Sequence, residues 1–200
     1  MINREEYLKK LESAMWDGNI KVITGLKRSG KSTLLFELFY DYLISAGVSE
    51  ENVIKLKLDE RKYYIYRNPI ALCDVVEKIL QEHQDEKYYL FIDEVQMAKK
   101  TLVKNEYGSD EVSIYDMLNE LRGYKNLDVY VTGSNSKMLS SDIATEFRGR
   151  STQIHVYPLS FKEVYSFMVE MRRMYLNYIS VLAACLNLQI RKQKEKKWNI

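Results

Sequence analysis

The stretch "GLKRSGKST" (residues 25–33) lies between the apolar run "IKVIT" (20–24) and the run "LLFELF" (34–39). It fits the pattern G-x-x-x-x-G-K-[ST], in which glycines let successive backbone N–H groups converge on phosphate oxygens. A helix that begins near Lys31 would direct its N-terminal dipole at the same anion. The alternative is a glycine-rich turn with an incidental lysine, and a strand before the loop and a helix after it favour the phosphate loop.

Each residue type in this loop has a part in that chemistry. Lys31 would reach the β- and γ-phosphates of a nucleotide, and the Ser32 hydroxyl would be offered to Mg²⁺. The residues predicted to bind the nucleotide are Gly25, Leu26, Lys27, Arg28, Ser29, Gly30, Lys31, Ser32 and Thr33.

A second motif, "YYLFIDEVQ" (88–96), is an apolar strand that ends in two acids. Asp93 would hold the Mg²⁺ shell, usually through water, and Glu94 could polarise an attacking water. A strand that ends in Asp-Glu is a weak signal alone, but it is strong some sixty residues after a phosphate loop. Adjacent acids at this place favour hydrolysis over phosphate transfer to a small molecule.

Two further segments follow. In "VYVTGSNS" (129–136), Ser134 or Asn135 could hold the attacking water and sense loss of the γ-phosphate, although a serine there could instead cap the next helix. In "FRGR" (147–150), an arginine at a domain edge could complete a neighbour's site, or it could form an ordinary ion pair.

Hydrophobic periodicity predicts five strands that alternate with helices. The sheet should therefore be largely parallel, with helices on both faces and the ligand site at the carboxyl ends of the strands. Segment 97–111 reads as a surface loop or a partly helical insertion. The predicted strands are 20–24, 52–58, 87–93, 127–133 and 151–159, and the predicted helices are 4–15, 31–47, 68–83, 112–124, 136–149 and 160–170.

Charge and composition restrict the function classes. The 200 residues carry a net charge of +2, but residues 171–200 hold seven of the 30 basic residues and only one of the 28 acids. The preceding 170 residues therefore carry a net charge of −4, so the body is not a broad nucleic-acid surface. The basic end could bind nucleic acid, although a run of charges is usually just a solvated end. Two cysteines give neither a disulfide framework nor a metal-ligand spacing. No signal peptide is visible, and the apolar run 175–190 reads as a helix rather than a membrane span.

The stretches "VITGLKRSGKSTLL", "LFIDEVQ", "VTGSNSKMLS" and "FRGRSTQIHVYPLSFKEVYSF" resemble the AAA+ branch of the P-loop ATPases. They resemble more closely a prokaryotic family of ATP-binding proteins in which an ATPase domain precedes a C-terminal domain. The resemblance covers roughly residues 3 to 167. It implies an α/β fold, a three-layer αβα P-loop NTPase of the AAA+ (ASCE) type. Its five-stranded sheet would have one strand inserted between the strands of the two motifs.

The same resemblance implies ATP and Mg²⁺ as cofactors. It assigns Lys31 and Ser32 to phosphate and metal, Asp93 to the metal and Glu94 to catalysis. Ser134 or Asn135 falls at the sensor position, and Arg150 is a better candidate than Arg148 for an arginine that acts in a neighbouring subunit.

We therefore expect an AAA+ ATPase domain over residues 1–170 and a basic helical tail over 171–200, where the resemblance ends. The expected function is Mg²⁺-dependent ATP hydrolysis that drives or gates an unidentified partner in the cytoplasm, without a membrane. We also expect a homo-oligomer in which one subunit supplies this arginine to the ATP site of its neighbour. The alternative is a nucleotide-dependent binding switch, or a truncated remnant, with little turnover. A small-molecule P-loop kinase ranks third, because no arginine-bearing lid is evident.

Overall fold

The computed structural model describes residues 2, 4–105, 108–133, 147 and 149–198, with side chains for all of these except 105 and 180–198. The chain forms two compact units. One comprises Arg4–Pro158, and residues 159–198 belong to the other. Each unit is described by itself below.

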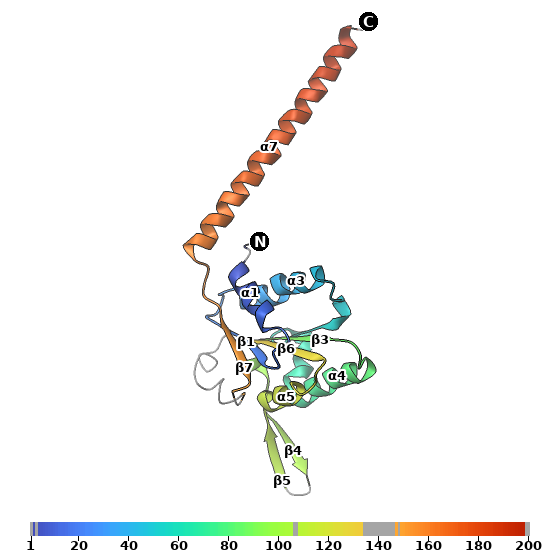
Figure 1. Ribbon diagram of the computed structural model, residues 1–200, viewed down its shortest axis with the longest axis vertical. Coiled ribbons are helices and arrows are strands. Elements are labelled where there is room, and N and C mark those ends of the chain that lie inside the picture. The colour runs from blue at the N-terminus through green and yellow to red at the C-terminus, as the bar shows by residue number, and fades with distance from the viewer. Residues whose placement is uncertain (1, 3, 106–107, 134–146, 148, 199–200) are drawn as a thin grey trace. The chain divides into compact units, whose positions relative to one another are not determined.

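The larger unit is built on a five-stranded sheet in the order β2-β3-β6-β1-β7 (Figure 1). All neighbouring strands in it are parallel, so β6 is inserted between β1 and β3, the strands that precede the two motifs. Every residue of β1, β3 and β6 is buried, as expected for interior strands covered on both faces. The strands are β1 (Ile20–Thr24), β2 (Val53–Lys57), β3 (Tyr88–Asp93), β6 (Leu127–Thr132) and β7 (Ser151–His155).

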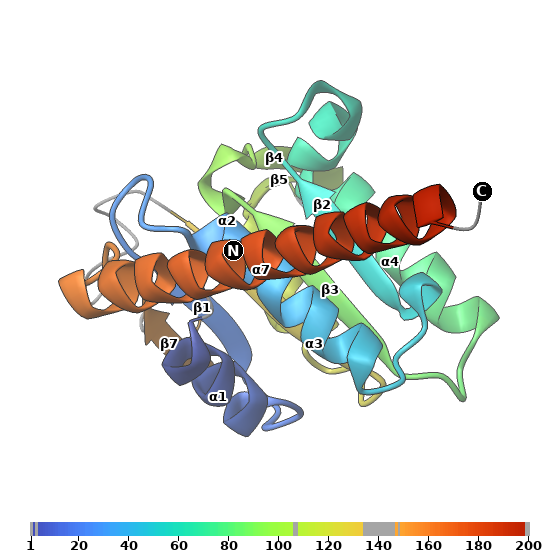
Figure 2. The same ribbon diagram turned by 90° about the horizontal axis from the view of Figure 1, so that it is seen from above.

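Helices cover both faces of this sheet. Figure 1 shows α1 and α3 on one face and α4 and α5 on the other, and Figure 2 shows the helical segment α2 to α3 crossing the strands with α1 beside it. The three-layer αβα architecture predicted from the sequence is thereby confirmed. The helices are α1 (Glu5–Ala14), α2 (Lys31–Thr33), α3 (Tyr40–Ser45), α4 (Pro69–Glu82) and α5 (Ile114–Leu121), and the π-helical stretch η1 (Leu34–Phe39) joins α2 to α3.

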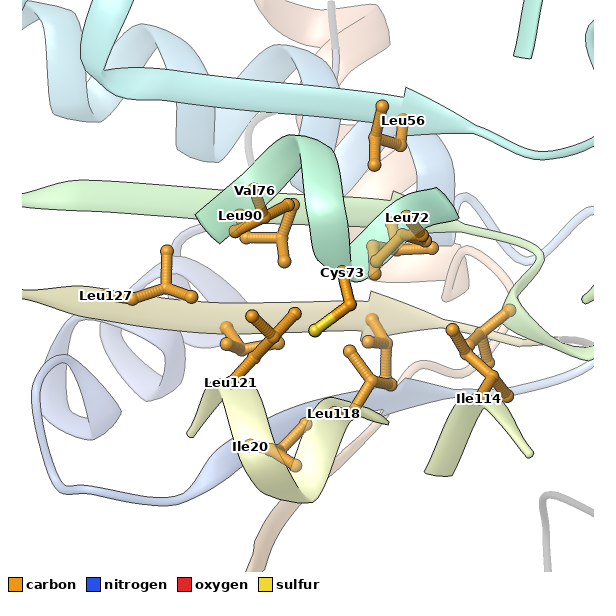
Figure 3. Close-up of a cluster of buried hydrophobic side chains, with 14 of the residues drawn as sticks. Ile20, Leu56, Leu72, Cys73, Val76, Leu90, Ile114, Leu118, Leu121 and Leu127 are labelled. Carbon is orange, nitrogen blue, oxygen red and sulfur yellow. The ribbon is translucent and has the colours of Figure 1, made fainter. Parts of the chain in front are cut away.

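Two hydrophobic clusters hold the layers together. Under α4 and α5 the cluster is aliphatic, and Figure 3 shows Val76 of α4 beside Leu90 of β3, and Cys73 of α4 facing Leu121 of α5. On the other face the cluster is aromatic, with Phe39 within 6 Å, centroid to centroid, of both Phe91 and Tyr130. Cys73 belongs to the aliphatic cluster and is only 5% exposed.

The interior strand β1 contains one charged residue, Lys21, which is fully buried. Its Nζ lies 2.5 Å from Asp128 Oδ1 and 2.9 Å from Asp17 Oδ1. The Tyr130 hydroxyl donates to the other Asp128 oxygen at 2.8 Å. A lysine can lie inside a sheet only when it is paired in this way.

The prediction for segment 97–111 was wrong. The structure has an antiparallel hairpin of β4 (Thr101–Asn105) and β5 (Gly108–Val112), preceded by the 3-10 turn η4 (Val95–Met97). The hairpin projects from the carboxyl edge of the sheet (Figure 1). Its second strand, "GSDEV", is exposed at its first four residues, so no alternation of apolar and polar residues reveals it. Two more 3-10 turns are η2 (Glu50–Asn52), before β2, and η3 (Arg61–Arg67), after it.

The smaller unit consists largely of one helix, α7 (Phe161–Trp198). The predicted helix 160–170 and the predicted helical tail are thus a single helix without a break at residue 170. Ser160 begins it, because its backbone N–H and its hydroxyl both donate to the Glu163 carboxylate at 2.7 Å. Among the described residues, no helix has the length and apolarity needed to cross a bilayer. The predicted helix 136–149 lies almost wholly outside the described residues.

Candidate functional site

The loop after β1 requires glycine at two positions. Gly25 has φ +147°, and a Cβ there would lie 2.2 Å from the Val156 carbonyl oxygen. Gly30 has φ +91° at the position that begins α2. Arg28 also has positive φ, at +68°, although it carries a side chain, so the loop stores strain at this residue. The loop is therefore held in one curled conformation.

Lys31 lies inside the curl and is only 4% exposed. Its Nζ donates to the carbonyl oxygens of Gly25 at 3.1 Å and Leu26 at 2.9 Å. Burial lowers the pKa of Lys31, while the charges of Glu94 and Asp93 act in the opposite direction. A buried ammonium bound only to carbonyls can exchange those partners for the oxygens of an anion.

The two motifs meet at Asp93, the last residue of β3. The Ser32 hydroxyl donates to Asp93 Oδ1 at 3.0 Å, and the Thr132 hydroxyl donates to the same oxygen. Burial raises the pKa of Asp93, the hydrogen bonds from Thr132 and Ser32 lower it, and nearby Glu94 and Asp59 raise it again. The Ser32 hydroxyl of α2 and the Asp93 carboxylate of β3 form the hard oxygen donor set that Mg²⁺ prefers.

Glu94 follows in a left-handed conformation, with φ +52°. Its backbone N–H donates to Thr132 Oγ1 at 3.1 Å, and Gln96 Nε2 donates to its carboxylate. Left-handed backbone is uncommon for a glutamate and is found where surrounding contacts impose it. Thr132, the last residue of β6, therefore fixes both acids through one hydroxyl.

The donors around the loop fit a polyphosphate. Ser29 Oγ is buried and has no hydrogen-bond partner among the described residues. An anion in the loop would find three kinds of hydrogen-bond donor: the unpaired Ser29 hydroxyl, the N–H groups at the start of α2, and the Lys31 ammonium. Ser32 and Asp93 offer oxygens to a cation at the same end of the sheet.

Arg4 is a residue of this site that the sequence patterns do not reveal. It is 5% exposed and donates to the carbonyl oxygens of Ser29 at 2.8 Å and Tyr157 at 2.7 Å. Its guanidinium lies 4.4 Å from the centre of the Tyr7 ring. It thus ties the loop to the segment after β7. Arg4 lies 25 positions from Ser29 and 153 from Tyr157 in the chain, so no local pattern could identify it.

The remaining predicted residues lie apart from this cluster or outside the described chain. Ser134, Asn135 and Arg148 are outside the described residues. Arg150 is exposed and precedes β7, and its carbonyl oxygen accepts from the Ile20 N–H at 3.1 Å. It therefore lies at the amino end of β1, about 16 Å of strand away from Gly25. Arg150 cannot reach the loop of its own chain.

Comparison with known sequences identifies the family to which this chain is similar. The family model described as an AAA domain matches residues 17–165. A protein of Haemophilus influenzae named only as uncharacterized is 36% identical over 163 residues, which cover 82% of this chain and 37% of that protein. The uncharacterized protein MJ1544 of Methanocaldococcus jannaschii is 30% identical over 171 residues, which cover 84% and 32%. The chain thus spans about a third of the length of these relatives.

Solved structures share the fold at low sequence identity. A Walker-type ATPase of Pyrococcus abyssi superposes with a TM-score of 0.54 at 18% identity, over 88% of this chain and 59% of that one. Cdc6p of Pyrobaculum aerophilum gives 0.53 at 14% identity, over 84% and 48%. At these identities the similarity shows a shared fold, that is, the same arrangement of helices and strands.

Proposed function

This chain belongs to the AAA domain family, and on that premise we propose that it binds ATP with Mg²⁺ and hydrolyses the β–γ phosphoanhydride bond. We further propose that hydrolysis drives or gates a partner in the cytoplasm. The observation that carries the proposal is the hydrogen bond between Ser32 and Asp93, 61 positions apart. It brings the phosphate loop and the acidic strand end to one point, as ATP hydrolysis with a metal requires.

Binding rests on the loop and on the start of α2. Backbone N–H groups from Gly25 to Thr33 would surround the phosphates, with Lys31 as the point charge on the β- and γ-phosphates. The phosphate charges would favour the charged form of Lys31, which burial disfavours in the bare loop. Ser32 and Asp93 would hold Mg²⁺, which when bound neutralises charge on the phosphates.

Glu94 is the residue proposed to receive a proton from the attacking water. Its backbone is fixed by Thr132 and its carboxylate by Gln96, so both the position and the orientation of the base are determined by neighbours. General-base assistance of this kind contributes about 10²–10⁴-fold in rate. Ser134 or Asn135 would hold the water beside the γ-phosphate, as the sequence predicts.

The last part of the proposed site comes from a second copy of the chain. Arg150 is exposed immediately before edge strand β7 and has no side-chain partner among the described residues. An arginine at an exposed edge can reach a neighbour's γ-phosphate even though it cannot reach its own. We therefore propose a homo-oligomer in which Arg150, with Arg148 as the alternative, completes the adjacent site.

A nucleotide-dependent binding switch is the second candidate. The contact from Gln96 Nε2 to the Glu94 carboxylate favours it, because the amide occupies a carboxylate oxygen that a general base would use to accept the proton of water. Steady turnover of ATP distinguishes the two functions, since a switch would retain one bound nucleotide and release little phosphate.

The proposed binding function is tested by calorimetry with Lys31→Ala. Loss of the buried ammonium should abolish tight Mg·ATP binding while the protein stays folded. Lys125→Ala removes an exposed lysine at the amino end of β6 and should bind ATP as the parent protein does. Equal ATP affinity in the parent and in Lys31→Ala would refute the phosphate-loop assignment.

A further inference from the structure

A cavity of about 580 Å³ lies at the base of the β4–β5 hairpin, away from the phosphate loop. Three cationic residues line it, together with two exposed apolar side chains, Tyr64 and Leu102. The cations are Arg67, Lys99 and Lys100, and no acidic residue is among the lining residues. This surface follows strands β2 and β3, whereas the loop follows β1 on the other side of β6.

Hydrogen bonds join the two segments that line the cavity. The Lys99 backbone N–H donates to the Arg67 carbonyl oxygen at 2.7 Å, and the Thr101 hydroxyl donates to Asn68 Oδ1 at 3.2 Å. These bonds join the base of the hairpin to η3. Arg67 is itself positioned, because its Nε donates to the Leu58 carbonyl oxygen at 2.6 Å and its guanidinium lies 3.9 Å from the centre of the Tyr64 ring.

Positive charge on this surface is only partly neutralised. The Lys99 ammonium makes no ion pair within the described chain, while Lys100 pairs with Glu111 at 2.6 Å. Residues 100, 102 and 104 share one face of the hairpin, since side chains alternate along a strand. Lys100, Leu102 and Lys104 therefore extend the same surface outward over about 13 Å.

Exposed aromatic and apolar groups lie among these cations. Tyr64 is 52% exposed and Leu102 is 67% exposed. The segment "RKYYIYR" of η3 contains three basic and three aromatic residues in its seven positions. Phosphates are bound by cations, and unpaired bases stack on aromatic rings, so this combination matches the chemistry of a single strand. An acidic peptide would use the cations but would give Tyr64 no base to stack on.

We propose that this surface, termed the η3–hairpin surface and formed by Tyr64, Arg67, Lys99, Lys100, Leu102 and Lys104, binds single-stranded nucleic acid. The cations contact successive phosphates, and a base stacks on Tyr64. The net charge of −4 over residues 1–170 does not oppose this, because the charge that a strand meets is the local one. Binding at this surface requires no ATP hydrolysis, so it stands or falls independently of the proposed function.

The test is fluorescence anisotropy without nucleotide, using labelled oligothymidylate and oligouridylate of about 20 nucleotides, longer than the usual site sizes. With three or four phosphate contacts, the logarithm of the binding constant should fall against the logarithm of salt with a slope of about −2 to −3. The double variant Lys99→Ala/Lys100→Ala should bind at least tenfold more weakly and with a slope about 1.4 units shallower. Comparison of the two oligonucleotides tells DNA from RNA, and binding of either supports the proposal.

Matched variants separate this site from general charge effects. Lys78→Ala/Lys125→Ala removes two exposed lysines elsewhere and should leave binding unchanged. The basic residues of 171–200 are present in all variants, so their contribution is common to all. Tyr64→Ala should weaken binding about tenfold, as loss of one stacked base does, and Tyr64→Phe should not.

Three results would overturn the proposal. They are no binding of either oligonucleotide, equal loss of binding in the two double variants, and binding of a polyglutamate peptide as tight as that of the oligonucleotides. The last result would assign the surface to an acidic protein. Thermal unfolding of each variant shows that the fold is retained.

Discussion

At the scale of single residues, Asp93 and Glu94 are neighbours in sequence with different surroundings. Asp93 is buried and accepts from Ser32 and Thr132, whereas Glu94 is partly buried and held through its backbone. We therefore expect mutation of Asp93 and mutation of Glu94 to have different effects on ATP binding and hydrolysis. Asp93→Asn should weaken Mg²⁺-dependent ATP binding, because it removes the charged oxygen from the cation site.

Glu94→Gln should retain Mg·ATP and lose about 10²–10⁴-fold in hydrolysis rate, because an amide cannot accept the proton. Calorimetry measures binding, and phosphate release measures turnover. If both variants hydrolyse ATP at the rate of the parent protein, the acids are ordinary strand-end residues.

A second prediction at this scale concerns Arg4 and the ATP affinity of the loop. Arg4→Ala would leave the Ser29 carbonyl oxygen without a hydrogen bond from a charged donor, at a cost of roughly 1.5–3 kcal/mol. The loop should loosen, and ATP affinity should fall about tenfold beyond any loss of folded protein. Arg4→Lys should restore only part of the affinity, because one ammonium replaces a planar fork that reaches two carbonyls.

The control for Arg4 is Arg122→Ala. Arg122 Nη1 donates to the Gly18 carbonyl oxygen at 2.9 Å, at the amino edge of the sheet, so its loss removes a similar bond far from the loop. This variant should lower the melting temperature without changing the ATP affinity of the folded protein. A similar change of affinity in both variants would show that Arg4 acts only through stability.

At the scale of helices and strands, the sequence was informative where local chemistry determines structure. All five strands of the sheet were predicted, since buried runs bounded by turn residues identify them. The helix predicted over 68–83 is observed as α4, and its start is capped by the Asn68 side chain, which accepts from the Ile70 N–H at 3.0 Å. The glycines and Lys31 were found because the phosphate loop is contiguous in sequence. Their nucleotide roles stay predictions.

The features that the sequence did not reveal depend on contacts between distant segments. The β4–β5 hairpin is exposed and polar, so its strands have no buried face that would leave a pattern. The Thr132 hydroxyl contacts both acids, although Thr132 lies 38 and 39 positions away from them in the chain. The η3–hairpin surface forms only when residues 64–67 meet residues 99–102. In each case the information lies in tertiary packing.

The packing of α4 predicts an unreactive thiol. Burial raises the pKa of Cys73 to about 12, with the Glu77 charge as the next cause. Because the raised pKa favours the protonated thiol, the thiolate fraction at pH 8.5 should be on the order of a thousandfold below that of an ordinary cysteine, whose pKa is about 8.5. In a Cys185→Ser background, iodoacetamide should label the native protein very slowly and the urea-unfolded protein quickly. Equal labelling rates would show that the cluster in Figure 3 is open to solvent.

At the scale of the whole molecule, the two edges of the sheet differ in chemistry. The carboxyl edge gathers the phosphate loop and the acids, and at the amino edge Arg150 lies exposed beside the first residue of β1. Parallel strands make this separation unavoidable, since every strand presents the same end to the same edge. If Arg150 takes part in hydrolysis, as proposed above, it must therefore act in the site of another copy of the chain.

This separation predicts that hydrolysis depends on self-association. Arg150→Ala should bind ATP normally and lose about 10³–10⁵-fold in hydrolysis rate, the contribution of an arginine supplied in trans. Mixing Arg150→Ala with Lys31→Ala should partly restore activity, because one subunit contributes the intact loop and the other the intact arginine. Lys125→Ala, which also removes an exposed charge at the amino edge, should hydrolyse ATP as the parent protein does. The trans arrangement is wrong if specific activity stays constant over a wide dilution range and mixing restores nothing, and Arg150 would then be no more than a surface residue.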